Sequence, residues 1–184
     1  MKIIRDPELD EIFVEGKSGF EGRLLKVRID KVKLPNGRIT TREYIRHPGA
    51  VAIVPVLPDG SIVLVKQFRY ATGSVLYEIP AGKIDPGEEP DACARRELSE
   101  ETGYEAANWR YLTAIATTPG FTDELIHLYL AEGLEQFDQH TDPDEFVKIE
   151  VVAPETVVEM IRDGRICDGK TIAALGFLAI EKLK

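Results

Sequence analysis

The stretch AGKIDPGEEPDACARRELSEETGY, residues 81–104, contains the strongest structural signal in the sequence. It begins with a loop of glycine and proline and continues into a run of charged residues. Pro90 suits the first turn of an α-helix, and Gly103 suits the residue that follows a last turn. We therefore predict one helix over about residues 89–102, after a loop whose glycines let the backbone approach a ligand closely.

Three acidic side chains share one face of this predicted helix. Glu97 and Glu101 are four residues apart and Glu100 lies between them, so at about 100° per residue the three are neighbours. Like charges at this spacing destabilise an isolated helix by about 0.2–0.5 kcal/mol per pair. Arg95 and Arg96 are expected to offset part of this repulsion. A divalent cation would offset more, because carboxylates are the hard ligands that Mg²⁺ and Mn²⁺ prefer. The alternative is an acidic face that only meets solvent.

The segments around this stretch predict a sheet. An alternating run at residues 20–33 precedes the turn Pro35-Asn36-Gly37, which predicts a hairpin. Further strand-like runs occupy residues 38–47, 50–56, 61–70, 75–82, 109–119, 124–134 and 146–154, and helical runs occupy residues 154–164 and 169–183. The predicted class is α+β, an α/β/α sandwich with a mixed sheet between helices and an additional N-terminal β-hairpin region.

The composition is typical of a globular protein, since 43% of the 184 residues are hydrophobic and 30% are charged. The net charge of −9 argues against nucleic acid as a partner, although a phosphate compound could bind through a bridging cation. Neither a signal peptide nor a run of about 20 apolar residues is present. We therefore expect a cytoplasmic protein without a membrane partner. Cys93 and Cys167 have no disulfide-framework or zinc-site spacing, and Cys93 is expected to be a small buried helix residue.

The spacing of residues 82–104 resembles the signature of the Nudix hydrolases, GX5EX7REUXEEXGU, in which U is a bulky aliphatic residue. Gly82, Glu88 and the run at 96–103 match every fixed position. Only Tyr104 departs from the pattern, as an aromatic residue that can fill the same packing position. The resemblance implies a Nudix fold for this chain.

The same resemblance implies roles for the acidic residues. It implies a divalent cation held by four residues, the main-chain carbonyl of Ala81 and the side chains of Glu97, Glu100 and Glu101. Glu100 and Glu101 are expected to be catalytic through that cation. Mg²⁺ is the expected cofactor, with Mn²⁺ as a substitute. Glu88 and Arg96 are expected to form a structural ion pair between loop and helix.

The Nudix resemblance also implies cleavage of a nucleoside diphosphate linked to another group. Pro119, in TTPGFTDE, lies 16 residues beyond Gly103 and resembles the loop of ADP-ribose pyrophosphatases, as do REYIRHPGAVAIVP, KQFRY and LYEIPAGK. We therefore expect hydrolysis of the pyrophosphate of ADP-ribose, or of a close nucleotide sugar, to AMP and ribose 5-phosphate. The alternatives are another nucleotide sugar such as GDP-mannose and a non-hydrolytic nucleotide-sugar sensor.

Several residues outside the signature are candidates for substrate binding. The Arg69 guanidinium can fork onto two phosphate oxygens. Glu78 is expected to hold a sugar or base hydroxyl, or to pair with a neighbouring cation. Pro119 and Glu124 are expected to reach the substrate from the proline loop.

The general base is expected on the acidic loop that precedes the last strand. In the ADP-ribose pyrophosphatase subfamily the base resembles a glutamate on such a loop, and here Glu145 is the first choice. Asp142 and Asp144 are the alternatives. His47 and His127 receive no catalytic role.

The N-terminal strands, residues 1–48, are predicted to be a dimerisation segment, and residues 49–184 to be the Nudix hydrolase domain. The resemblance implies a homodimer that exchanges the N-terminal segment. Arg42 or Arg46 would then reach the substrate of the partner.

Overall fold

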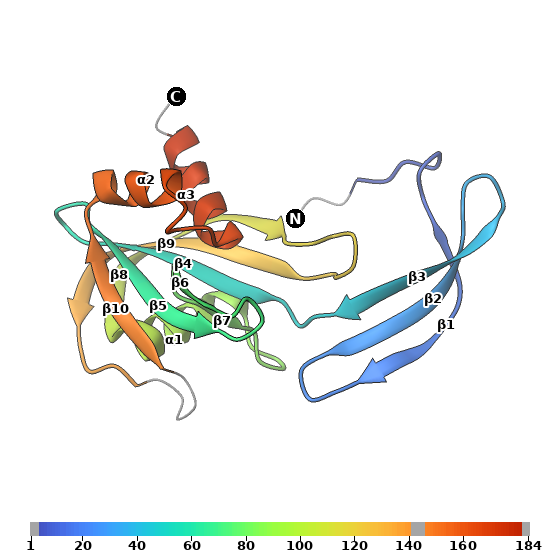
Figure 1. Ribbon diagram of the computed structural model, residues 1–184, viewed down its shortest axis with the longest axis horizontal. Coiled ribbons are helices and arrows are strands. Elements are labelled where there is room, and N and C mark those ends of the chain that lie inside the picture. The colour runs from blue at the N-terminus through green and yellow to red at the C-terminus, as the bar shows by residue number, and fades with distance from the viewer. Residues whose placement is uncertain (1–3, 141–145, 182–184) are drawn as a thin grey trace. The chain divides into compact units, whose positions relative to one another are not determined.

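The computed structural model describes residues 4–140 and 146–181 (Figure 1). The chain forms two compact units. The first comprises residues 1–48 and 116–125, and the second comprises residues 49–115 and 126–184. The segment 116–125 therefore groups with the N-terminal residues.

The first unit is built on a three-stranded antiparallel sheet in the order β1-β2-β3. β1 spans Ile12–Glu21, β2 spans Lys26–Lys33 and β3 spans Ile39–Arg46. Gly37, in the turn between β2 and β3, has φ 81°, a left-handed conformation that glycine adopts without steric cost. The hairpin predicted around this turn is confirmed.

β1 was not predicted, and the extended run expected over residues 20–33 is divided. The N–H of Gly22 donates to the carbonyl of Leu25 at 2.8 Å, and this contact closes a turn between β1 and β2. All ten residues of β1 are exposed, with Phe13 at 61% and Phe20 at 58%. A strand that buries neither face lacks the alternation of polar and apolar residues by which strands are detected.

The segment 116–125 is attached to the end of β3 by main-chain hydrogen bonds. The N–H of Ile45 donates to the carbonyl of Phe121 at 2.8 Å, and the N–H of Asp123 donates to the carbonyl of Ile45 at 3.2 Å. Ile45 also forms a parallel bridge with Thr122. The proline loop is therefore a short extension of the N-terminal sheet.

The second unit contains a seven-stranded mixed sheet. Its main path runs β10-β5-β4-β9-β8, while β6 pairs with β5 and β7 pairs with β4. The strands are β4 (Ala50–Val56), β5 (Ile62–Arg69), β6 (Ser74–Glu78), β7 (Ala81–Lys83), β8 (Tyr104–Ala116), β9 (Leu125–Gln136) and β10 (Val147–Val152). β4 runs parallel to β9 and antiparallel to β7. The predicted mixed sheet is confirmed.

Helices cover both faces of this sheet (Figure 1). The helices are α1 (Pro90–Thr102), α2 (Pro154–Arg162) and α3 (Gly169–Glu181). One cluster of the core includes Leu64 and Leu128 with residues of α2 and α3, and the other includes Ile53 with Leu98 of α1. Residues 50–54 of β4 are buried on both faces, which explains their continuous apolar run. The predicted α/β/α sandwich is confirmed.

α1 coincides with the predicted helix over residues 89–102. It ends at Gly103, which has φ 67° and donates its N–H to the carbonyl of Ser99 at 2.8 Å. Cys93 lies in this helix and is buried, as predicted, and burial raises the pKa of its thiol to about 12. None of the described helices combines the length and the apolar character that crossing a membrane requires.

Candidate active site

The candidate site of the second unit lies where α1 faces β7. β7 pairs with β4, so that Gly82 is opposite Val51 in the sheet. The main-chain N–H of Ala81 donates to Oε2 of Glu101 at 2.9 Å. Glu101 is only 4% exposed. A carboxylate is thus held beside the loop at low solvent exposure, where its interaction with a cation is screened little.

Gly82 lets a second carboxylate lie directly against the backbone of β7. A Cβ placed on Gly82 would be 1.9 Å from Cδ of Glu97 and 2.0 Å from its Oε1. Real Cβ contacts do not approach so closely, so no side chain fits at position 82 while Glu97 holds this place. The first glycine of the signature is therefore required by the close approach of Glu97.

Arg96 connects the loop to the acidic face of α1. Its Nε and Nη2 donate to the two carboxylate oxygens of Glu88, each at 2.9 Å. The ion pair predicted between these residues is present. Hydrogen bonds from Arg96 lower the pKa of Glu88 to about 2. Nη1 of Arg96 donates to Glu97 at 2.8 Å and to Glu100 at 3.0 Å, so this one guanidinium offsets the repulsion between two acidic side chains.

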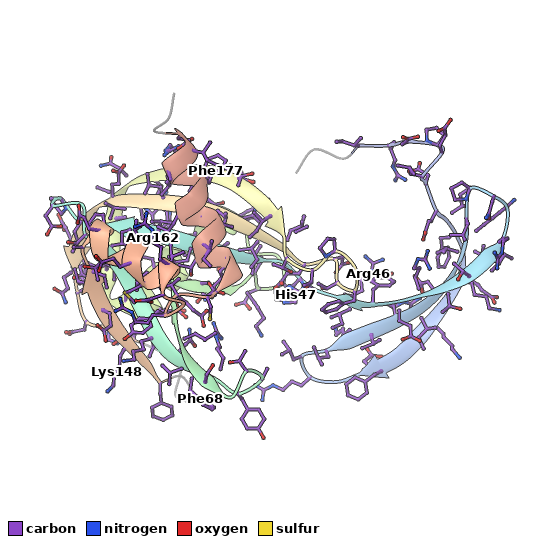
Figure 2. All side chains as sticks on the ribbon, turned by 45° about the horizontal axis from the view of Figure 1, so that its top comes forward. Arg46, His47, Phe68, Lys148, Arg162 and Phe177 are labelled. Carbon is purple, nitrogen blue, oxygen red and sulfur yellow. The ribbon has the colours of Figure 1, made fainter. Side chains whose placement is uncertain are left out.

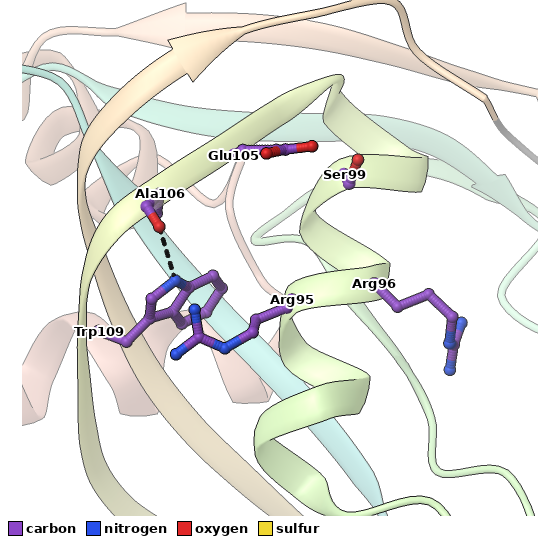
Figure 3. Close-up of a pocket in the computed structure, with 6 residues that line it drawn as sticks. All are labelled: Arg95, Arg96, Ser99, Glu105, Ala106 and Trp109. Carbon is purple, nitrogen blue, oxygen red and sulfur yellow. Dashed lines mark hydrogen bonds between the residues drawn. The ribbon is translucent and has the colours of Figure 1, made fainter.

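The other arginine expected to offset the acidic face has different partners. Arg95 donates to Asp91 at 3.0 Å, and its guanidinium lies 4.8 Å from the centre of the Trp109 ring. Figure 3 shows Arg95 turned toward Trp109 and Arg96 extending away from it. These residues, with Ser99, line a pocket of about 340 Å³ beside α1.

The donor set of this site fits a divalent cation in its chemistry. Glu97, Glu100 and Glu101 supply carboxylate oxygens, which are the ligands of Mg²⁺ and Mn²⁺. In residues 4–140 and 146–181, no three histidine, cysteine or acidic side chains are already grouped as a metal site. Glu97 and Glu100 are instead paired with Arg96. The metal roles of these residues and of Ala81 stay predictions.

A second charged cluster lies at the ends of β5 and β6. Arg69 donates from Nε and Nη2 to the two oxygens of Glu78, each at 2.8 Å. Lys170 also contacts the Glu78 carboxylate and pairs with Asp168 at 3.1 Å. Burial by itself raises the pKa of Glu78, but the hydrogen bonds from Arg69 and the charge of Lys170 outweigh it, and the pKa is lowered.

Sequence reasoning identified Arg69 and Glu78 but missed Lys170. β5 and β6 pair with Arg69 opposite Ser74 and Glu78 opposite Val65, so Arg69 and Glu78 meet through their side chains and not as cross-strand neighbours. Lys170 comes from α3, 92 residues beyond Glu78. The signal that could have found it is the DGKT run at residues 168–171, a charged group at the start of an otherwise apolar helix.

The remaining candidates for substrate binding belong to the first unit. Arg42 donates to Glu11 at 3.0 Å, and both residues line a groove of about 1060 Å³ together with Pro119. Glu124 accepts a hydrogen bond from Thr117 at 2.6 Å. Arg42 and Pro119 thus share one groove.

Two further ion pairs lie at the end of β3. Nε2 of His47 lies 3.4 Å from the Glu124 carboxylate, and Arg46 donates to Asp123 at 2.7 Å. Arg46 and His47 follow one another at the end of β3 (Figure 2).

The predicted general base lies outside the described residues. This holds for Glu145 and for the alternatives Asp142 and Asp144, so the predicted base stays a prediction.

Comparison with known proteins identifies the family. The family model described as the NUDIX domain matches residues 46–175. The chain therefore belongs to the Nudix family and is a hydrolase of that family, as residues 82–104 predict.

Relatives match this chain over nearly its full length. It is 41% identical to a methanol dehydrogenase activator of Bacillus methanolicus, over 94% of this chain and 95% of the relative. It is 40% identical to an ADP-ribose pyrophosphatase of Bacillus subtilis (strain 168), over 95% of each chain. A solved structure described as an ADP compounds hydrolase superposes with a TM-score of 0.84 at 22% identity, over 97% of this chain and 95% of that one. This last similarity supports the fold alone.

Proposed function

We propose that the protein hydrolyses the pyrophosphate of ADP-ribose, or of a close nucleotide sugar, to AMP and ribose 5-phosphate, with Mg²⁺ as the cofactor. The observation that carries this proposal is the placement of Glu97 against Gly82, beside the buried Glu101 held by Ala81. The two carboxylates thus lie beside Gly82, where no side chain separates them from the main chain of β7. The 40% identity with an ADP-ribose pyrophosphatase supports the choice of substrate.

The side chains of this chain divide the work of the reaction. Glu97, Glu100, Glu101 and the Ala81 carbonyl would hold the cation. When bound, the cation neutralises phosphate charge and makes a coordinated water more acidic. Arg69 would orient one phosphate through the guanidinium nitrogen that Glu78 does not use. The water oxygen bonds to one phosphorus while the bridging P–O bond breaks, and Glu145 would take the proton of the water.

The first unit suggests how the subunits associate. We propose that residues 1–48 form a homodimer interface and that residues 49–184 act as the hydrolase domain. β1 is an edge strand, paired only with β2 among the described strands, and it exposes Phe13 and Phe20. Apolar strand residues of this kind are commonly covered by another chain. Arg42 and Pro119, which share a groove in this unit, would contribute to substrate binding.

The experiment that tests the proposed reaction is a substrate panel. Purified protein with Mg²⁺ is given ADP-ribose, GDP-mannose and other nucleotide sugars, and products are identified after reaction in ¹⁸O water. Release of AMP from ADP-ribose, with the highest kcat/KM of the panel, is the expected result. The ¹⁸O label shows which phosphorus is attacked. Absence of AMP with both Mg²⁺ and Mn²⁺, from neutral to alkaline pH, would overturn the proposal.

A second candidate function follows from the relative of B. methanolicus. Identity to that methanol dehydrogenase activator and to the ADP-ribose pyrophosphatase differs by one percentage point, over 94% and 95% of this chain. Sequence identity therefore does not separate the two. The test adds the purified protein to a methanol dehydrogenase and measures the rate of alcohol oxidation with and without Mg²⁺. A rate increase that is lost in Glu101→Gln would support this candidate.

A further inference from the structure

The first turn of α3 contacts the end of β6 through two pairs of residues. Lys170 and Thr171 of α3 meet Glu78 and Ile79. The N–H of Ile79 donates to Oγ1 of Thr171 at 2.9 Å, in a buried contact. Its neighbour Glu78 meets the ammonium group of Lys170. Asp168 accepts the N–H of Thr171 at 3.0 Å, which caps the helix. The first turn of α3 is thus held in one orientation beside the Glu78 carboxylate.

Four charges alternate along this contact. The order is Arg69, Glu78, Lys170, Asp168, and each neighbouring pair is an ion pair. The Glu78 side chain is 2% exposed and that of Lys170 is 11% exposed, whereas that of Arg69 is 42% exposed. The four charges sum to 0, and Arg69 is the most exposed member of the cluster.

We infer that Lys170 is a positioning residue for Arg69, which keeps that guanidinium able to bind a phosphate. The inference rests on the proposed function. Glu78 accepts hydrogen bonds from Nε and Nη2 of Arg69, so Nη1 is the guanidinium nitrogen that Glu78 does not engage. Lys170 also pairs with Glu78. The negative charge of Glu78 is therefore balanced by two cations, and the positive field of Arg69 toward a bound phosphate is cancelled less.

Replacing Lys170 would change the net charge of the cluster without removing a side chain that is proposed to contact the substrate. In Lys170→Met the charges of Arg69, Glu78 and Asp168 sum to −1 instead of 0. Arg69 would then be the only cation beside Glu78 and Asp168. The cluster would carry a net negative charge, which repels the negatively charged pyrophosphate. A purely structural role, in which Lys170 only fastens α3 to β6, predicts lower stability in place of this specific loss of anion affinity.

The test measures binding and turnover separately. Wild type, Lys170→Met and the control Lys148→Met, an exposed lysine of β10 (Figure 2), are assayed for kcat and KM with ADP-ribose and Mg²⁺. Their affinity for α,β-methylene ADP-ribose is measured by calorimetry. Lys170→Met is expected to raise KM and Kd on the order of tenfold, with kcat within about twofold of wild type, because phosphate binding is lost equally in ground and transition states. Lys148→Met should match wild type.

A double variant separates positioning from fastening. Asp168 loses its cationic partner when Lys170 is replaced. Lys170→Met with Asp168→Asn therefore returns the cluster to a charge of 0, and it keeps both Glu78 and an oxygen that can accept the N–H of Thr171. Binding of the analogue should recover to within about threefold of wild type, and Lys170→Arg should also bind like wild type. The single variant Asp168→Asn is measured beside them. Recovery in the double variant is not expected if Lys170 acts only through stability.

The outcomes that overturn the inference are distinct from those that overturn the proposed function. If wild type neither hydrolyses ADP-ribose nor binds its analogue, the proposed function fails and the inference fails with it. If wild type is active, the inference fails when folded Lys170→Met binds like wild type, or when the double variant binds as weakly as Lys170→Met. If only Lys170→Met does not fold, the double variant decides by the same threefold criterion. Unfolding of both variants assigns Lys170 to structure alone.

Discussion

β4 and β1 show how differently the two units of this chain treat their apolar residues. β4 buries residues 50–54 between helices on both faces of its sheet. β1 exposes all ten of its residues, phenylalanines included. The second unit therefore contains its own core, whereas the first leaves the apolar side chains of β1 exposed.

The candidate functional residues follow the same division. The carboxylates of α1 and the pair of Arg69 with Glu78 belong to the unit with the closed core. Arg42 and Pro119 belong to the unit with the open strand, and they line one groove there. A rigid core suits groups that must hold a cation in place, and a loop on an open sheet suits groups that select a substrate. Substitutions in each unit should therefore have different consequences.

The largest effect is expected for Glu101→Gln in the second unit. The amide oxygen can still accept the N–H of Ala81, but the buried charge is lost. Activity should fall on the order of a thousandfold, about 4 kcal/mol of transition-state stabilisation, while Tm stays within about 2 °C of wild type. Glu105→Gln, at an exposed glutamate of β8, is the control. A large drop in Tm with activity retained would mean that Glu101 is structural.

Gly82→Ala should have the next largest effect. The new Cβ would meet the Glu97 carboxylate at 1.9–2.3 Å, so Glu97 must leave its place. A displacement of about 1 Å at a reacting site can cost a factor of about 100, and we expect a loss in kcat/KM of that order. Gly176→Ala, where a Cβ meets nothing within 4 Å, should keep full activity. Equal activity in the two variants would contradict the close approach described for Gly82.

In the first unit, the double variant Phe13→Ser with Phe20→Ser should weaken association and leave the other unit folded. Each phenylalanine contributes about 1.5–3 kcal/mol when it is fully buried, so dimer affinity should fall at least about 100-fold. Light scattering over a dilution series measures the change. Val158→Ser, at an exposed apolar residue of α2, is the control. Unchanged mass in the double variant, or a monomeric wild type, would exclude β1 from an interface.

The smallest effect is expected for Glu88→Gln and concerns stability against pH. The pKa of Glu88 is lowered from 4.5 to about 2 by Arg96. A carboxyl whose pKa is lower in the folded state stabilises that state above its unfolded pKa, and the stabilisation is lost as pH falls to the folded pKa. The difference in unfolding free energy between wild type and Glu88→Gln should be constant above about pH 5 and should shrink between pH 4.5 and 2.

Urea unfolding at stepped pH measures this difference. Glu89→Gln, at the exposed neighbouring glutamate, is the control and should follow wild type throughout. A difference that grows on acidification would contradict the ion pair with Arg96.

The local parts of the site were predictable from sequence. Gly103 ends α1 as expected, and Glu88 meets Arg96 only eight residues away. Helix ends and such contacts depend on residues within a few turns of each other, and their spacing is visible in the sequence. The role of Gly82 was only partly visible, because its reason is a contact with Glu97 and not a turn that requires positive φ.

The long-range parts were not predictable in the same way. Lys170 meets Glu78 across 92 residues, and Thr122 joins Ile45 across 77 residues. Neither pair has a periodicity or spacing that a local pattern could reveal. β1 was missed for a related reason, since a strand exposed on all its residues leaves no alternation to detect.

The sequence by itself thus determined the family, the mixed sheet between helices and the acidic face of α1, because these follow from spacing and periodicity over short stretches of chain. Only the tertiary structure decided that Gly82 makes room for Glu97, that the proline loop extends the N-terminal sheet, and that Lys170 completes the cluster around Arg69. Those contacts arise when distant segments pack together, and packing depends on the shape and charge of the whole fold.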